Sequence, residues 1–197
     1  MLRYFLPVYL LVYFGTAFFL PTFRVWRKTK INPLVLGNSD DARDYIGRVF
    51  KIVMVMIAIV VLIYSFAPQF YEFLMPIRIL ERTETQIVGI ALLLLSLGWT
   101  ILAQIQMGNS WRIGIDQKQK TNLVRSGVFG VSRNPIFLGM IITLFGLFLV
   151  LTNAFTLLIF VLGFVLIQIQ VRLEEEFLTN MHEIDYREYR QSVRRWL

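Results

Sequence analysis

The chain has 197 residues, of which 56% are hydrophobic, and its mean hydropathy of +0.61 excludes an ordinary soluble domain and predicts an integral membrane protein. Its net charge of +7 comes from basic residues that lie between apolar runs, so membrane surfaces rather than nucleic acid are the expected partners. The absence of cysteine excludes disulfides and thiolate nucleophiles, and a single histidine, His182, argues against a metal site.

Five apolar runs approach or reach the length of about 20 residues that a helix needs to cross a bilayer. In chain order they are 4–23, 49–70, 86–105, 135–151 and 154–169. Only Thr152 and Asn153 separate the last two, which predicts a tight helical hairpin. Residues 177–197 show apolar side chains at spacings of three and four, which predicts a C-terminal helix. The predicted fold is an all-α integral membrane protein with about five transmembrane helices.

The basic residues predict an orientation in the membrane. The segment 24–51 has seven of them, whereas 71–84 has two. Because Lys and Arg are enriched in cytoplasmic loops, we expect the N-terminus outside and the C-terminus in the cytoplasm. Residues 1–105 then hold three transmembrane helices with a basic cytoplasmic loop at 24–48, and residues 106–197 form a second part.

Arg133-Asn134-Pro135 predicts the start of the fourth helix, since proline is favoured in the first turn. Free backbone donors and the helix dipole make such an end suitable for an anion, and Arg133 adds positive charge. From these residues alone a second interpretation stays open. Arg133 is then an ordinary anchor at the membrane surface, and Asn134 a cap of the helix.

Three consecutive glutamates, Glu174 to Glu176, end the fifth helix. Carboxylates beside a bilayer core usually face a polar cavity or a partner. At 100° per residue they do not share one face, so one carboxylate can enter a pocket while another pairs with Arg172 or with the C-terminal tail. The alternative is a solvated helix end with local ion pairs.

Four segments together resemble the isoprenylcysteine carboxyl methyltransferase family and the related membrane phospholipid methyltransferases. They are GNSWR at 108–112, LVRSGVFGVSRNPIFLG at 123–139, EEEFL at 174–178 and YREY at 186–189. The family pattern is Arg-His-Pro-x-Tyr-x-Gly, followed after a hairpin by Glu-Glu. Here it is found at 133–139 and 174–175, and the resemblance covers about the last ninety residues.

The resemblance implies S-adenosylmethionine as cofactor and makes 106–197 the cofactor-binding methyltransferase core. The cofactor's ammonium and sulfonium suit a glutamate, its carboxylate suits a helix N-terminus, and apolar residues suit its adenine. The reaction needs no metal. Arg172 and Glu175 are the expected catalytic residues. Cofactor contacts are expected from Leu123, Val124, Gly127, Phe129, Arg133, Asn134, Pro135, Phe137, Gly139 and Glu174.

Three positions depart from the family pattern. Asn134 replaces a histidine and Phe137 a tyrosine, which still permits hydrogen bonding and stacking. Gln170 stands where prenylcysteine enzymes have an arginine assigned to the substrate, and Arg172 can substitute if the helix register allows it. The resemblance therefore implies a lipophilic acceptor without identifying it. The acceptor is either the carboxylate of a prenylated or other lipidated molecule, or a lipid amine.

Two other functions remain open from the sequence. One is a non-catalytic membrane scaffold or transport component whose basic loops bind anionic lipid headgroups. The other is a membrane reductase that uses a nicotinamide cofactor, although the chain has no recognisable dinucleotide glycine motif.

Overall fold

The computed structural model describes residues 2–30, 42–108 and 123–197. All regular elements in these ranges are helical, which confirms the predicted all-α class. In chain order they are α1 (Leu2–Phe14), the π-helical turn η1 (Gly15–Phe19), α2 (Leu20–Thr29), α3 (Ala42–Phe66), the 3₁₀ helices η2 (Pro68–Leu74) and η3 (Arg78–Leu80), α4 (Thr83–Met107), the 3₁₀ helix η5 (Gly127–Gly130), α5 (Pro135–Val150) and α6 (Ala154–Ser192).

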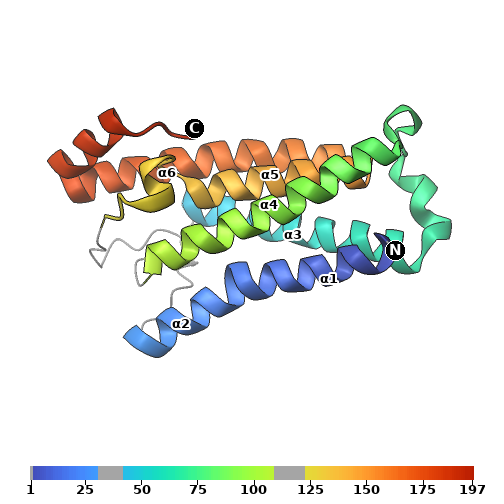
Figure 1. Cartoon of the computed structure of the whole chain (residues 1–197), viewed down its shortest axis with the longest axis horizontal. Coiled ribbons are helices and arrows are strands. Elements are labelled where there is room, and N and C mark those ends of the chain that lie inside the picture. The colour runs from blue at the N-terminus through green and yellow to red at the C-terminus, as the bar shows by residue number, and fades with distance from the viewer. Residues whose placement is uncertain (1, 31–41, 109–122) are drawn as a thin grey trace.

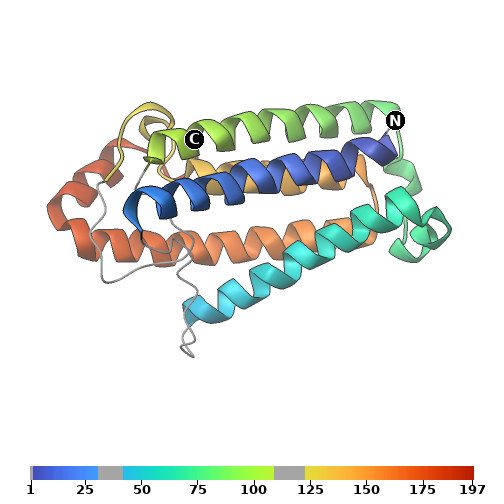
Figure 2. The same cartoon turned by 90° about the horizontal axis from the view of Figure 1, so that it is seen from below.

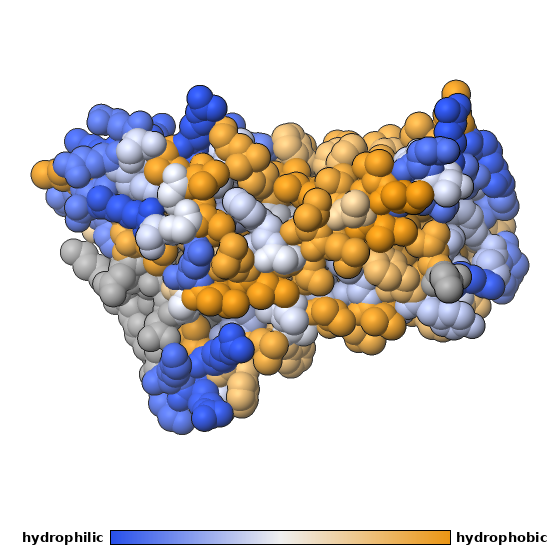
Figure 3. Space-filling model, in the orientation of Figure 1, coloured by the Kyte–Doolittle hydropathy of each residue, from blue (hydrophilic) through white to orange (hydrophobic). Residues whose placement is uncertain are grey.

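The helices lie side by side along the long axis of the molecule (Figures 1 and 2). We call the end that holds η5 and the start of α5 the site end, and the end that holds η2 and η3 the far end. Hydrophobic residues dominate the middle of the face in Figure 3, and hydrophilic residues gather at both ends. Within the described ranges, four helical stretches are long and apolar enough to cross a membrane, and α5, with 16 residues, is a shorter fifth. Which end faces the cytoplasm stays a prediction.

The first predicted helix continues through η1 and α2 to Thr29. Pro21 explains the π-helical turn, because it has no N–H for the carbonyl of Ala17 and its ring disfavours regular α-helix there. Gln104 of α4 donates a side-chain hydrogen bond to that carbonyl instead. The predicted loop 24–48 is therefore wrong at its first end, and residues 31–41 lie outside the described ranges.

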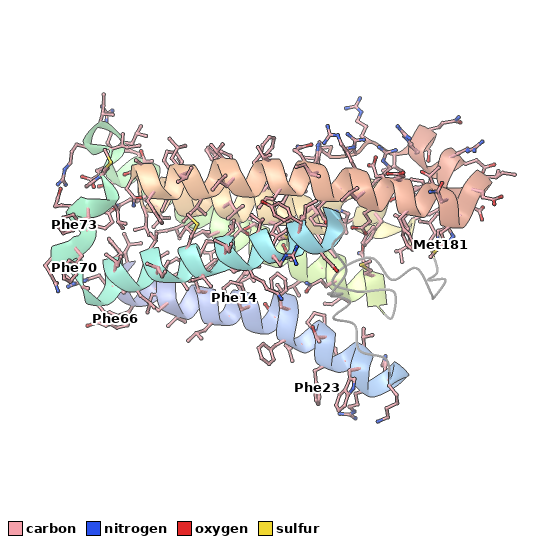
Figure 4. The ribbon with its side chains drawn as sticks, turned by 180° about the vertical axis from the view of Figure 1, so that it is seen from behind. Phe14, Phe23, Phe66, Phe70, Phe73 and Met181 are labelled. Carbon is pink, nitrogen blue, oxygen red and sulfur yellow. The ribbon has the colours of Figure 1, made fainter. Side chains whose placement is uncertain are left out.

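The second predicted helix is shifted toward the N-terminus. It begins at Ala42, so the predicted loop is helical at its second end too, and it ends at Phe66 rather than at residue 70. Pro68 starts the 3₁₀ helix η2 there, because proline cannot supply the N–H that a continuing α-helix needs. Phe66, Phe70 and Phe73 are exposed at this far end (Figure 4), where aromatic residues are typical of a membrane interface.

Helices α4 and α5 approach closely because glycines face the neighbouring helix. A Cβ at Gly89 would lie 2.9 Å from the backbone oxygen of Gly146, and one at Gly139 would lie 2.2 Å from the Thr100 hydroxyl oxygen. Between them, the hydroxyls of Ser96 and Thr143 are 2.9 Å apart. This packing fixes the start of α5 against the last turns of α4.

The predicted hairpin of α5 and α6 is present, with Asn153 capping α6 through the backbone N–H of Thr156 at 2.8 Å. Before its break at Glu183, the straight part of α6, 154–182, extends for about 44 Å, well beyond a hydrocarbon core of roughly 30 Å. We therefore assign about its first twenty residues, 154–173, to the membrane.

The C-terminal helix differs from its predicted form. Residues 170–182 contain no glycine or proline, so α6 continues through 177 without interruption. The helix breaks only at Glu183, where φ is 41° and ψ is −106°. Beyond it the chain folds back along the site end of the bundle (Figure 1).

Candidate functional site

The two halves of the sequence pattern meet at the site end. Asn134 precedes the first turn of α5 but makes no side-chain cap to its own helix. Its amide Nδ2 instead donates to Oε1 of Glu175 on α6 at 3.1 Å. These residues are 41 positions apart in the chain, and both are buried. Trp99 of α4 donates to the carbonyl of Pro135 at 2.8 Å and so fixes the same turn from the other side.

Glu175 is the centre of a buried ion network. Arg133 Nη2 lies 3.2 Å from its Oε1, and Arg195 approaches with two atoms, Nη2 at 2.8 Å from Oε2 and Nε at 3.1 Å from Oε1. Burial alone raises the pKa of this carboxyl, but the hydrogen bond from Arg195 and the charges of both arginines hold it below its ordinary value. Two guanidiniums against one carboxylate leave the network with a net positive charge.

Glu174 differs from its neighbour. Its side chain is partly buried, and among the residues that the structure describes no hydrogen bond or ion pair to it is found. Burial and the adjacent charge of Glu175 raise the pKa of Glu174 to about 7. One of the two adjacent carboxylates is therefore neutralised by arginines, while the other is half protonated near neutral pH.

The C-terminal segment binds the residues that lead into α5. The carbonyl of Arg194 accepts from the backbone N–H of Arg133 at 3.0 Å, and the carbonyl of Arg195 accepts from Ser132 Oγ at 3.2 Å and from Asn134 Nδ2 at 3.4 Å. The Tyr189 hydroxyl donates to the carbonyl of Phe129 at 2.6 Å. Arg195 is not predicted from the sequence, because it resembles the other basic residues of the tail.

The segment before α5 closes against the end of α4. Val124 packs on a small apolar cluster that includes Val128 and Phe129, and Leu123 is partly buried. Gly127 has a φ of +64°, which glycine adopts without strain, and a Cβ there would lie 2.3 Å from Oε1 of Gln106. The same Gln106 oxygen accepts from the backbone N–H of Val128 at 2.8 Å.

The remaining predicted residues lie around this centre or apart from it. Phe137 packs against the main apolar core, and Gly139 lies against α4. Arg172 is exposed and donates to the carbonyl of Gln168 in its own helix at 2.6 Å, so it does not join the Glu175 network. Residues 109–112 of the GNSWR segment lie outside the described ranges.

Taken together, the site end offers cationic, anionic and apolar groups within one small region. The net positive network and the start of α5 suit a bound carboxylate or phosphate. The side chain of Glu174 suits a cation or a proton, and the cluster around Phe129 suits an apolar ring. A ligand with all three features would find a partner for each.

A family model described as phospholipid methyltransferase matches residues 85–184, about half of the chain. The match begins in α4 and includes α5, the hairpin and both carboxylates at 174 and 175. Comparison with curated proteins and with solved structures gives no match.

Proposed function

The chain belongs to the phospholipid methyltransferase family, which contains the isoprenylcysteine carboxyl methyltransferases, and we propose that it transfers a methyl group from S-adenosylmethionine to a lipophilic acceptor. The apolar helices and the family together make it an integral membrane methyltransferase. The hydrogen bond between Asn134 and Glu175 carries the finer proposal, because it joins the two motif halves in one region.

In this proposal the cofactor's groups are divided among the residues of the site end. Glu174 attracts the ammonium or the sulfonium, since no arginine among the described residues neutralises its charge. The carboxylate binds near the start of α5, beside Arg133. The adenine packs against apolar side chains around Val124 and Phe129. Glu175 is then a positioning residue, because it holds Arg133 and Asn134 in place rather than contacting the reacting atoms.

The replacement of a histidine by Asn134 fits this role. The amide donates one hydrogen bond to Glu175, as an imidazole N–H would. The replacement of a tyrosine by Phe137 removes a hydroxyl, but an aromatic ring remains. These two substitutions therefore leave the framework of the proposed site intact.

The class of the acceptor depends on two residues. S-adenosylmethionine supplies an activated methyl group, so the protein's main task is to hold the acceptor in line with it. A lipid amine must lose a proton before attack, and Glu174, with a pKa raised to about 7, accepts one near neutral pH. A carboxylate acceptor needs no base, and the exposed Arg172 at the end of the spanning part of α6 is placed to attract it.

Calorimetric titration of the purified protein with S-adenosylmethionine tests the cofactor. We expect saturable binding that weakens about tenfold or more in Asn134→Ala and Glu174→Gln. Asn134→Ala loses the hydrogen bond to the charged Glu175, and Glu174→Gln loses the charge that attracts the cofactor. Glu84→Gln, an exposed carboxylate at the far end, is the matched control and should bind as the unmodified protein does. Absence of saturable binding to the unmodified protein would contradict the proposal.

A second experiment identifies the acceptor. The protein is incubated with methyl-labelled cofactor and a total lipid extract, and the labelled fraction is isolated. Label in an amine-containing lipid that is lost in Glu174→Gln supports the amine. Label in a lipidated carboxylate that is lost in Arg172→Ala supports the carboxylate. No incorporation at all would favour a non-catalytic scaffold.

A further inference from the structure

A break in α6 separates the C-terminal segment from the rest of the helix. Glu183 has a φ of 41°, which is unfavourable for a residue with a side chain and costs on the order of 1–3 kcal/mol. After this residue the chain reverses and folds back, as seen near the labelled Met181 in Figure 4. We call residues 184–197 the C-terminal segment.

The C-terminal segment covers Arg133, Asn134 and Glu175, three of the residues that the proposed function uses. Arg195 contacts both carboxylate oxygens of Glu175, and backbone carbonyls of the segment accept hydrogen bonds from Ser132, Arg133 and Asn134. As a result Glu175 is only 4% exposed and Asn134 only 7%. A ligand cannot reach either residue while these contacts persist.

The C-terminal segment is held mainly by polar contacts. Among its side chains only Tyr186 and Tyr189 are buried, and their rings meet edge to face with centroids 5.9 Å apart. Trp196 is partly buried against the core, and most other side chains are exposed. Segments with little buried apolar surface open locally at a lower free energy than global unfolding requires.

We propose that the C-terminal segment is a lid that hinges at Glu183 and is held closed over the site by the ion pair between Arg195 and Glu175. The guanidinium of Arg195 neutralises a carboxylate of the site before any ligand enters. The lid opens to admit the ligand and closes behind it, which excludes water from the methyl transfer. The lid is proposed from the contacts above, and only the identity of the ligand rests on the proposed function.

The opening is measurable without any ligand. Because the chain has no cysteine, the pair Glu176→Cys and Gln191→Cys introduces one spin label before the break in α6 and one on the lid after it, both at exposed positions. Pulsed electron spin resonance on the full chain should give one dominant distance. Adding Arg195→Ala should produce a second, longer distance, and an unchanged distribution would overturn the lid.

Two further variants make this result specific. Arg194→Ala removes an exposed side chain but keeps the carbonyl that Arg133 contacts, so its distance distribution should equal that of the parent. Tyr189→Phe removes only the hydroxyl that bonds to Phe129 and keeps the ring, so it should open the lid less than Arg195→Ala. If Arg195→Ala does not fold, Tyr189→Phe still decides the question, and the absence of any longer distance would overturn the proposal.

Stopped-flow mixing with S-adenosylmethionine connects the lid to the ligand. If opening limits entry, Arg195→Ala should raise both the association and the dissociation rate about tenfold or more, with a smaller change in Kd. Arg194→Ala should leave both rates unchanged. Equal rates in Arg195→Ala and the parent would overturn gating. If S-adenosylmethionine binds to no variant, the proposed function fails, while the spin-label distances still decide whether the lid exists.

Discussion

Both ends of the bundle contain one charge held between two opposite charges. At the far end Arg78 contacts Glu72 and lies 2.8 Å from Glu81, and its side chain is 64% exposed. At the site end Glu175 lies between Arg133 and Arg195, and its side chain is 6% exposed. The same chemical arrangement therefore occurs once in water and once in a buried environment.

Burial decides what each arrangement contributes. Solvent screens the charges around Arg78, so losing one of them changes little. At the site end the charges of Glu175 and Arg133 are already desolvated and that of Arg195 is partly so, which makes the loss of a partner costly. The far-end network therefore contributes little to stability, whereas the site-end network determines how α5, α6 and the C-terminal segment lie together.

The largest expected effect comes from Glu175→Gln. The change removes the carboxylate charge that Arg133 and Arg195 both contact, and breaking a buried pair in this way costs roughly 3–5 kcal/mol. Denaturant unfolding in detergent, followed by tryptophan fluorescence, measures the loss. Arg78→Ala is the comparison, and its midpoint should not move within error. Equal behaviour of the two variants would remove the contrast between the ends.

Glycine substitutions compare how the two ends of the α4 and α5 contact tolerate a side chain. Gly139→Ala places a methyl group on the Thr100 hydroxyl and should cost about 1–3 kcal/mol, which Thr100→Ala should largely restore. Gly89→Ala meets backbone atoms of Gly146 and Val150, so no side-chain truncation should restore it. Thermal unfolding of the single and double variants gives the coupling. A rescue that fails at Gly139 would contradict the predicted contact.

An uncharged buried contact should have a smaller effect. Gln104→Leu leaves the carbonyl of Ala17 without its donor, at a cost of about 1–2 kcal/mol. In a Pro21→Ala background a backbone N–H becomes available to that carbonyl, so the same substitution should cost less. A double-mutant cycle from unfolding midpoints tests the coupling. Additive effects would mean that Pro21 is not the reason for the contact.

The last prediction concerns the pH dependence that Glu174 gives to stability. Its folded pKa is raised above the ordinary value of 4.5 to about 7, so its contribution to stability is present below about 4.5 and is lost as pH rises through 7. Glu174→Gln should reduce the slope of melting temperature against pH between about pH 5 and 7, compared with the parent. Glu84→Gln should keep the parent's slope. An identical slope in all three proteins would mean that Glu174 is solvated and would contradict its raised pKa.

Hydropathy was sufficient for much of the fold. The apolar runs, the short connection at Thr152 and Asn153, and Pro135 at a helix start all correspond to elements of the structure. The ends of the helices were harder to predict, because they depend on which backbone N–H groups are available to continue the helix. Pro68 ends α3 early, and the absence of a helix-breaking residue after 169 lets α6 continue to Glu183.

The sequence alone could not distinguish the roles of adjacent residues in the site. Glu174 and Glu175 are one residue apart on α6, and only the rotation of the helix against α5 decides which carboxylate meets Asn134. Long side chains on a helix lean toward its N-terminus, which is why Arg172 reaches Gln168 rather than Glu175. The division of the chain at residue 106 and its orientation in the membrane stay predictions.

The sequence by itself determined that the chain is an all-helical membrane protein and that two motif segments flank a hairpin, because apolar periodicity and residue order are local properties. Only the tertiary structure decided that Arg195 completes the Glu175 network and that the C-terminal segment covers the site. The reason is the reversal of the chain at Glu183, which no local sequence pattern predicts. It brings a tail arginine onto a carboxylate 20 residues earlier in the chain.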